Sequence, residues 1–263
     1  MKRLGIGTVL KNAFSVLFQN FGIALLIAVL CGGLGAAFMT KGVEWAVYYS
    51  GVHDKQQLLY VTQFGQLILL TIWGCIVGAW AAPAGIYLWV QREKGQVATA
   101  YDAVNYGLNR FGRVLSAHAR AFLVIQIGMI VIVPGILFGL QYAFVDAIAT
   151  LDTKEDSPLS RSRRLTSGRR GTIFRTFLVF TVWWLPFQLM GIYVMQGAPV
   201  LAQVLGGTID HLVLLVIDLC MVQYYLDLFR NRTPDAAPRS EGLPQGSVAV
   251  VTGGASSAPA EGA

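Results

Sequence analysis

Ionisable side chains lie inside stretches of this chain that are otherwise apolar. Four of them are candidates for a buried polar site: Asp146, Asp210, His211 and Asp218. Charged groups are costly inside a bilayer, so by default they indicate a functional site. Asp210 and Asp218 are eight residues apart, which brings them to roughly the same face of one helix. Two interpretations follow: a proton or cation relay, or a buried polar pair that fixes helix packing.

His118 and Arg120 are further ionisable residues, at the start of another apolar stretch. The histidines and acids match no metal-binding spacing such as H-E-x-x-H, so we expect no metal and no cofactor. The sequence has no G-x-S-x-G motif and no Cys/His constellation for nucleophilic catalysis, so we expect no enzymatic activity. Residues 248–254 resemble the first strand of a dinucleotide-binding fold, which we interpret as chance because no such fold follows.

The composition of the chain is that of a membrane protein. Of 263 residues, 55% are hydrophobic and only 13% are charged, which is about half the charged fraction of soluble domains. A run of about 20 apolar residues can cross a bilayer, and several such runs occur. In a membrane protein, a net charge of +6 usually comes from basic residues in the cytoplasmic loops, so we expect no binding to nucleic acid. The three cysteines lie singly in apolar runs and predict no disulfide framework.

The hydropathy pattern predicts an all-α integral membrane protein with a six-span domain at residues 21–230. The expected transmembrane helices are at about 21–39, 64–90, 115–133, 136–151, 172–194 and 200–229. Pro134 and Gly135 separate the third from the fourth. One helix over both would be roughly 55 Å long, so a tight hairpin is favoured over a kinked helix. Residues 231–263 are expected to form a disordered cytoplasmic tail.

Amphipathic segments precede the expected hairpins. Residues 1–20 carry apolar side chains at helical spacing and predict an interfacial helix, with a cleaved signal peptide as the alternative. A second such helix is expected to begin near Thr99, and a third at Ser157 and Pro158. We interpret the chain as three units, each an interfacial helix followed by a helical hairpin.

Lysines and arginines are concentrated in every second connection. The rich segments hold Lys2, Arg3, Lys11, Arg92, Lys94, Arg110, Arg113, Lys154, the arginines between 161 and 170, Arg230 and Arg232. The other connections hold only Lys41 and Lys55. The positive-inside rule assigns the rich side to the cytoplasm, so both termini are expected there.

One basic segment is much denser than the others. It holds the candidate lipid-head-group ligands Arg161, Arg163, Arg164, Arg169 and Arg170. Anionic head groups attract such segments by about 1 kcal/mol per basic residue. The alternative is that the arginines only set the topology.

Small residues recur at four-residue spacing in two of the expected spans. They are Gly74, Gly78 and Ala82, and then Gly135 and Gly139. Such residues allow close helix contact. We expect packing within the bundle, and a homodimer seam is the alternative.

Residues 82–230 resemble a family of bacterial six-span proteins named after the membrane domain attached to some glycerophosphoryl diester phosphodiesterases. The resemblance is carried by residues 133–136, 144–152 and above all 159–170, which are similar to the family's basic segment LRRSWxLTxGRR. Arg163 stands at the tryptophan position, and Gln141 and Ala147 replace an arginine and a proline. The resemblance implies an inner-membrane location and the six-span plan. It implies no phosphodiesterase activity, because that chemistry belongs to a separate soluble domain.

Three functions remain open at this point. The first is a non-catalytic protein that organises membrane lipids or unidentified protein partners through its basic segments at the cytoplasmic face. The second is a transporter of a small solute or ion that uses the buried acids of the fourth and sixth spans. An intramembrane enzyme is the third.

Overall fold

The computed structural model describes residues 4–51, 54–152, 157–195 and 200–232, and all regular elements in these residues are helical. In residues 170–195, side chains are described only as far as Leu185, with the exception of residue 183. The elements are α1 (Ile6–Gln19), α2 (Phe21–Ala28), the π-helical turn η1 (Val29–Gly33), α3 (Leu34–Ser50), α4 (Lys55–Glu93), α5 (Ala100–Met129), α6 (Val133–Tyr142), α7 (Val145–Leu151), α8 (Pro158–Thr166), α9 (Arg170–Met195) and α10 (Val200–Arg232).

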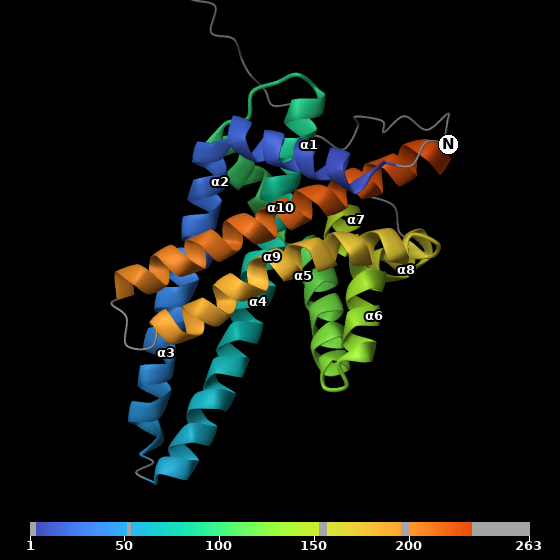
Figure 1. Ribbon diagram of the computed structural model, residues 1–263. Coiled ribbons are helices and arrows are strands. Elements are labelled where there is room, and N and C mark those ends of the chain that lie inside the picture. Colours follow the sequence, from blue (N-terminus) through green and yellow to red (C-terminus); the bar gives the residue numbers. More distant parts are fainter. Residues whose placement is uncertain (1–3, 52–53, 153–156, 196–199, 233–263) are drawn as a thin grey trace, which may run out of the picture.

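The first hairpin pairs the stretch α2–η1–α3 with α4 (Figure 1). The π-helical turn occurs where α10 crosses, and both helices have glycine at the crossing. A Cβ on Gly207 would lie 2.9 Å from the carbonyl carbon of Gly32, so neither backbone could approach with a larger residue. Asp54 begins α4 by accepting hydrogen bonds from the backbone N–H groups of Gln56 and Gln57, at 3.0 and 2.9 Å.

The second hairpin pairs α5 with α6 (Figure 1). Pro134 lies in the first turn of α6, where the missing N–H costs nothing. The helix is interrupted again between α6 and α7, and hydrogen bonds from α8 stabilise this interruption. Ser162 donates to the Gln141 carbonyl at 2.8 Å and accepts from the Phe144 N–H at 3.2 Å. Thr166 reaches the same Gln141 carbonyl at 3.3 Å.

Helices α9 and α10 run obliquely across the two hairpins, at the end opposite their turns (Figure 1). Helix α10 contacts α1, α2, η1, α3, α4, α7 and α9, so it forms the centre of the fold. Its buried side chains, including Leu219, Cys220 and Val222, join the largest apolar core.

The helical class and the presence of helices able to cross a membrane are confirmed. Among the described residues, four stretches are long and apolar enough: Phe21–Ser50, Thr71–Glu93, Val133–Leu151 and Val200–Leu228. The expected third span lies in α5, which is not among them. Much of the expected fifth span lies beyond the described side chains.

Three boundaries differ from the expectation. The first apolar helix continues to Ser50, well past residue 39, because no breaking residue interrupts it. The helix expected to begin near Thr99 does begin there, capped by Thr99, but it is not separate from the third span: α5 runs unbroken from Ala100 to Met129, since its sequence keeps helical spacing throughout. The expected tail began at residue 231, but α10 extends to Arg232. The rest of that tail, with residues 248–254, lies outside the described residues.

Candidate functional site

A histidine and an aspartate meet where α5 passes the start of α7. His118 Nδ1 lies 2.9 Å from both carboxylate oxygens of Asp146. The side chains are 19% and 27% exposed, so the pair is largely enclosed and not sealed. Asp146 occupies the first turn of α7, where the helix dipole favours a negative charge.

Two glycines of α4 make room for the histidine. A Cβ on Gly78 would lie 2.5 Å from Cε1 of His118, so only glycine lets the ring lie against the α4 backbone. The Phe122 ring stacks on the imidazole with 6.0 Å between centroids, and a Cβ on Gly74 would meet Phe122 at 3.3 Å. The small residues at 74 and 78 therefore pack within the bundle, against α5.

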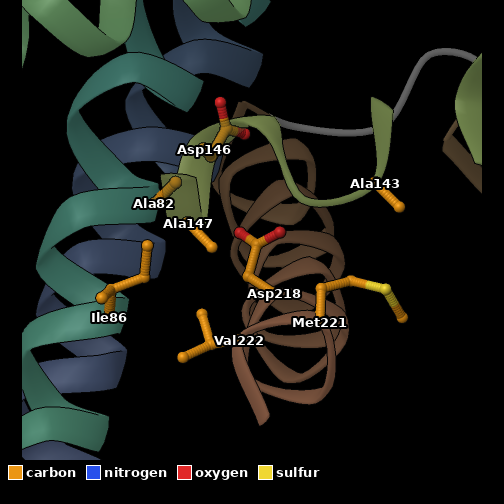
Figure 2. Close-up of a pocket in the computed structure, with 8 residues that line it drawn as sticks. All are labelled: Ala82, Ile86, Ala143, Asp146, Ala147, Asp218, Met221 and Val222. Atoms are coloured by element: carbon orange, nitrogen blue, oxygen red, sulfur yellow. The ribbon is translucent and has the colours of Figure 1, made fainter. Parts of the chain in front are cut away.

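A second aspartate approaches from α10. Asp218 and Asp146 both line a small cavity of about 20 Å³ (Figure 2), enough for one water molecule. The other lining residues are Ala82, Ile86, Ala143, Ala147, Met221 and Val222. Among the residues that the structure describes, the Asp218 carboxylate makes no hydrogen bond or ion pair, whereas Asp146 is paired with His118. The site thus joins one histidine and two carboxylates from three helices.

The other two polar candidates of α10 lie apart from this site. Asp210 accepts a hydrogen bond from Trp184 Nε1 of α9 at 3.2 Å. His211 Nδ1 lies 3.3 Å from the Gly207 carbonyl, beside the crossing with η1. The expected grouping of Asp210 with Asp218 is therefore not found, since two helical turns separate them and different helices cover each. Asp218 instead shares its cavity with Asp146.

The arginines of the dense basic segment differ in their exposure and in their contacts. Arg161 forms a largely buried ion pair with Asp152, and Arg169 Nη1 lies 3.5 Å from Asp227 Oδ2 on α10. Arg170 is half-buried. Arg163 and Arg164 are exposed, whereas Ser162, Leu165 and Thr166 of the same helix are buried. Of the five arginines, Arg163 and Arg164 are the exposed ones, and Arg164 also interacts within the chain.

Arginines of other basic segments also bind within the chain. Arg110 Nε donates to the Thr150 carbonyl at 2.9 Å, and Arg113 donates to the Asp152 carbonyl. Arg92 donates to the Asn12 carbonyl at 3.0 Å and thereby ties the end of α4 to α1. The Arg110 and Arg113 contacts thus bind the carbonyl end of α7.

Sequence reasoning missed two features of this region. Ser162 and Thr166 anchor α8, and their four-residue spacing around Leu165 was the available signal. The partner of His118 was also missed, because contact between residues 28 positions apart depends on the α6–α7 break.

Comparison with known proteins adds no relative: the chain matches no family model, no curated protein and no solved structure.

Proposed function

We propose that this chain is a non-catalytic, multi-pass protein of the inner (plasma) membrane that binds anionic lipid head groups at its cytoplasmic face. The observation that carries the proposal is the exposure of Arg163 and Arg164 on α8, a helix whose opposite face is buried against the bundle. An exposed guanidinium group on a helix packed against the bundle suits phosphate oxygens, which arginine binds in a bidentate manner.

The proposed topology has the termini and α8 on the cytoplasmic side, with three helical hairpins entering the membrane from there. The distribution of charge supports it. Arg92, Lys94, Arg113, Arg163 and Arg164 all lie on the proposed cytoplasmic side. On the other side, Lys41 forms an ion pair with Glu44 at 2.6 Å, so its charge is balanced. The excess of positive charge therefore falls on one side.

The test is lipid retention by the full chain. The double variant Arg163→Gln/Arg164→Gln would be purified from membranes that contain phosphatidylglycerol, and bound lipid would be counted by native mass spectrometry. Two basic residues at about 1 kcal/mol each correspond to roughly 30-fold weaker binding of anionic lipid. Lys41→Gln is the matched control, because Lys41 is exposed in the expected outer connection. Equal retention by the double variant and the control would refute the proposal.

A second candidate function is favoured by one observation, the Asp218 carboxylate that faces a cavity without a hydrogen-bonding partner among the described residues. With His118 and Asp146 beside it, the site could accept and release a proton or a small cation. The cavity has room for one water molecule, which favours a proton over a larger solute. Proton flux into proteoliposomes that is lost in Asp218→Asn and retained in Asp210→Asn would support this function. Absence of flux in the unaltered protein would exclude it.

A further inference from the structure

The turn of the α5–α6 hairpin is apolar and lies outside the protein core. Residues 121–140 contain no charge, and Gln126 is their only polar side chain. Four consecutive aliphatic residues form the turn and are 63–81% exposed: Ile130, Val131, Ile132 and Val133. Such a surface is stable when covered by hydrocarbon and costly when covered by water.

The turn of the α3–α4 hairpin has the opposite character. Ser50, Gly51 and the capping residue Asp54 lie there. Exposed aromatic residues surround it: Trp45, Tyr48, Tyr49 and Tyr60. Tryptophan and tyrosine are typical of the membrane–water interface. Both hairpins point the same way, and α3–α4 extends well beyond the α5–α6 turn (Figure 1).

Arg120 indicates how deep the α5–α6 turn can lie. Its side chain is exposed, and it precedes Ile130 by ten residues, or about 15 Å of helix. A bilayer core is about 30 Å thick. If the turn reached the far surface, Arg120 would face acyl chains near the bilayer centre. A turn that stops near the centre places Arg120 among the cytoplasmic head groups instead.

Part of the backbone of the turn makes its hydrogen bonds within the protein. The N–H groups of Ile130, Val131 and Ile132 donate to the preceding helix at 3.1–3.3 Å, and Pro134 has no N–H to satisfy. Lipid-facing backbone must have its hydrogen bonds made within the protein. The arms also pack closely, since a Cβ on Gly128 would lie 3.0 Å from the Cα of Gly135.

We propose that the α5–α6 hairpin is re-entrant: it enters from the cytoplasmic side, ends among the acyl chains and returns to the same side. The inference rests on the cytoplasmic placement of α8 in the proposed function. It refines the six-span plan: the α2–α3 stretch, α4, α9 and α10 cross, whereas the α5–α6 hairpin is inserted, although Val133–Leu151 is long enough to cross. It also places the His118–Asp146 pair near the cytoplasmic head groups, in agreement with the partial exposure of both side chains.

The test is the depth of a spin label in the full chain, reconstituted into vesicles of phosphatidylcholine and phosphatidylglycerol. Labels would be attached to Val131→Cys at the proposed inserted turn and to Ser50→Cys at the α3–α4 turn, with Cys75 replaced by alanine. Cys31 and Cys220 are buried, and the protein without an added cysteine reports their background. Collisions with molecular oxygen and with a water-soluble nickel chelate would be compared.

We expect the label at residue 131 to collide with oxygen and to lose the nickel collisions that the label at residue 50 shows. Equal nickel collisions at the two positions would overturn the proposal, because the turn would then lie in water. If Val131→Cys does not reconstitute, Ile130→Cys provides the same test. Lipid binding by α8 is measured separately by retention, so a failure of that function leaves the depth result interpretable.

Discussion

Replacing Gly78 by alanine should disrupt the site without altering any ionisable residue. The new Cβ would lie 2.5 Å from His118 Cε1, whereas ordinary van der Waals contact begins at 3.4 Å. The ring must therefore retreat by about 1 Å, because the α4 backbone that carries the methyl group cannot yield. Such a movement would stretch the 2.9 Å contact with Asp146 beyond hydrogen-bonding distance.

The expected cost follows from these contacts. Overpacking of this kind costs about 1–3 kcal/mol. Opening the His118–Asp146 contact adds a similar amount, since both groups are largely enclosed. We expect Gly78→Ala to lower the free energy of unfolding by about 2–6 kcal/mol. In the variant His118→Ala/Gly78→Ala the clash is absent, so the double variant should be no less stable than His118→Ala alone.

The assay is thermal unfolding of the purified protein, with a thiol-reactive dye reporting the exposure of the buried Cys31 and Cys220. Gly112→Ala is the control, because a Cβ there meets nothing within 4 Å. Helix propensity favours that change by up to about 1 kcal/mol. If Gly78→Ala unfolds like Gly112→Ala, or if the costs of Gly78→Ala and His118→Ala add in full, the reasoning is refuted.

Three more substitutions test the packing around α8 and α10 in the same unfolding assay. Arg161→Ala should cost up to about 3 kcal/mol, because it removes an ion pair of the largely buried Asp152; the exposed Arg163→Ala should change stability little, and similar losses would contradict this assignment. Ser162→Ala removes bonds to Phe144 and Gln141 and should cost about 1–3 kcal/mol, and an effect no larger than that of the exposed Ser160→Ala would speak against an anchoring role. Gly207→Ala should abolish the close crossing with η1, since its Cβ would meet the Gly32 backbone; a folded variant as stable as Gly171→Ala, whose Cβ is in open space, would show that the crossing is not required.

Much of the fold could be predicted from local pattern. Apolar runs of sufficient length determine helices in a membrane, because backbone hydrogen bonds must be made within each segment. The break at Pro134 was predictable for the same reason, since proline has no N–H and favours a first helical turn. Helix ends in polar stretches were harder to place, as α3 and α5 demonstrate: no proline interrupts residues 39–50 or 100–129.

The candidate site was only partly predictable. Asp146 and Asp218 were identified because charge is rare in apolar runs, but their shared cavity depends on how α7 and α10 pack. The expected partner of Asp218 was Asp210, chosen from spacing on one helix. In the structure, α10 runs obliquely, so different helices pack over the two residues. Similarly, a count of arginines could not reveal that Arg161 and Arg169 bind aspartates within the chain.

The most direct test of the account is the side of the membrane on which α8 lies. A membrane-impermeant maleimide would be applied to intact and to permeabilised cells that express Ser50→Cys or Ser160→Cys, each with Cys75 replaced by alanine. Both native serines are exposed, Ser50 at the α3–α4 turn and Ser160 on α8, the helix that carries the exposed Arg163 and Arg164. The account predicts labelling of residue 50 in intact cells and of residue 160 only after permeabilisation. Labelling of residue 160 in intact cells would place the arginines outside and contradict the account.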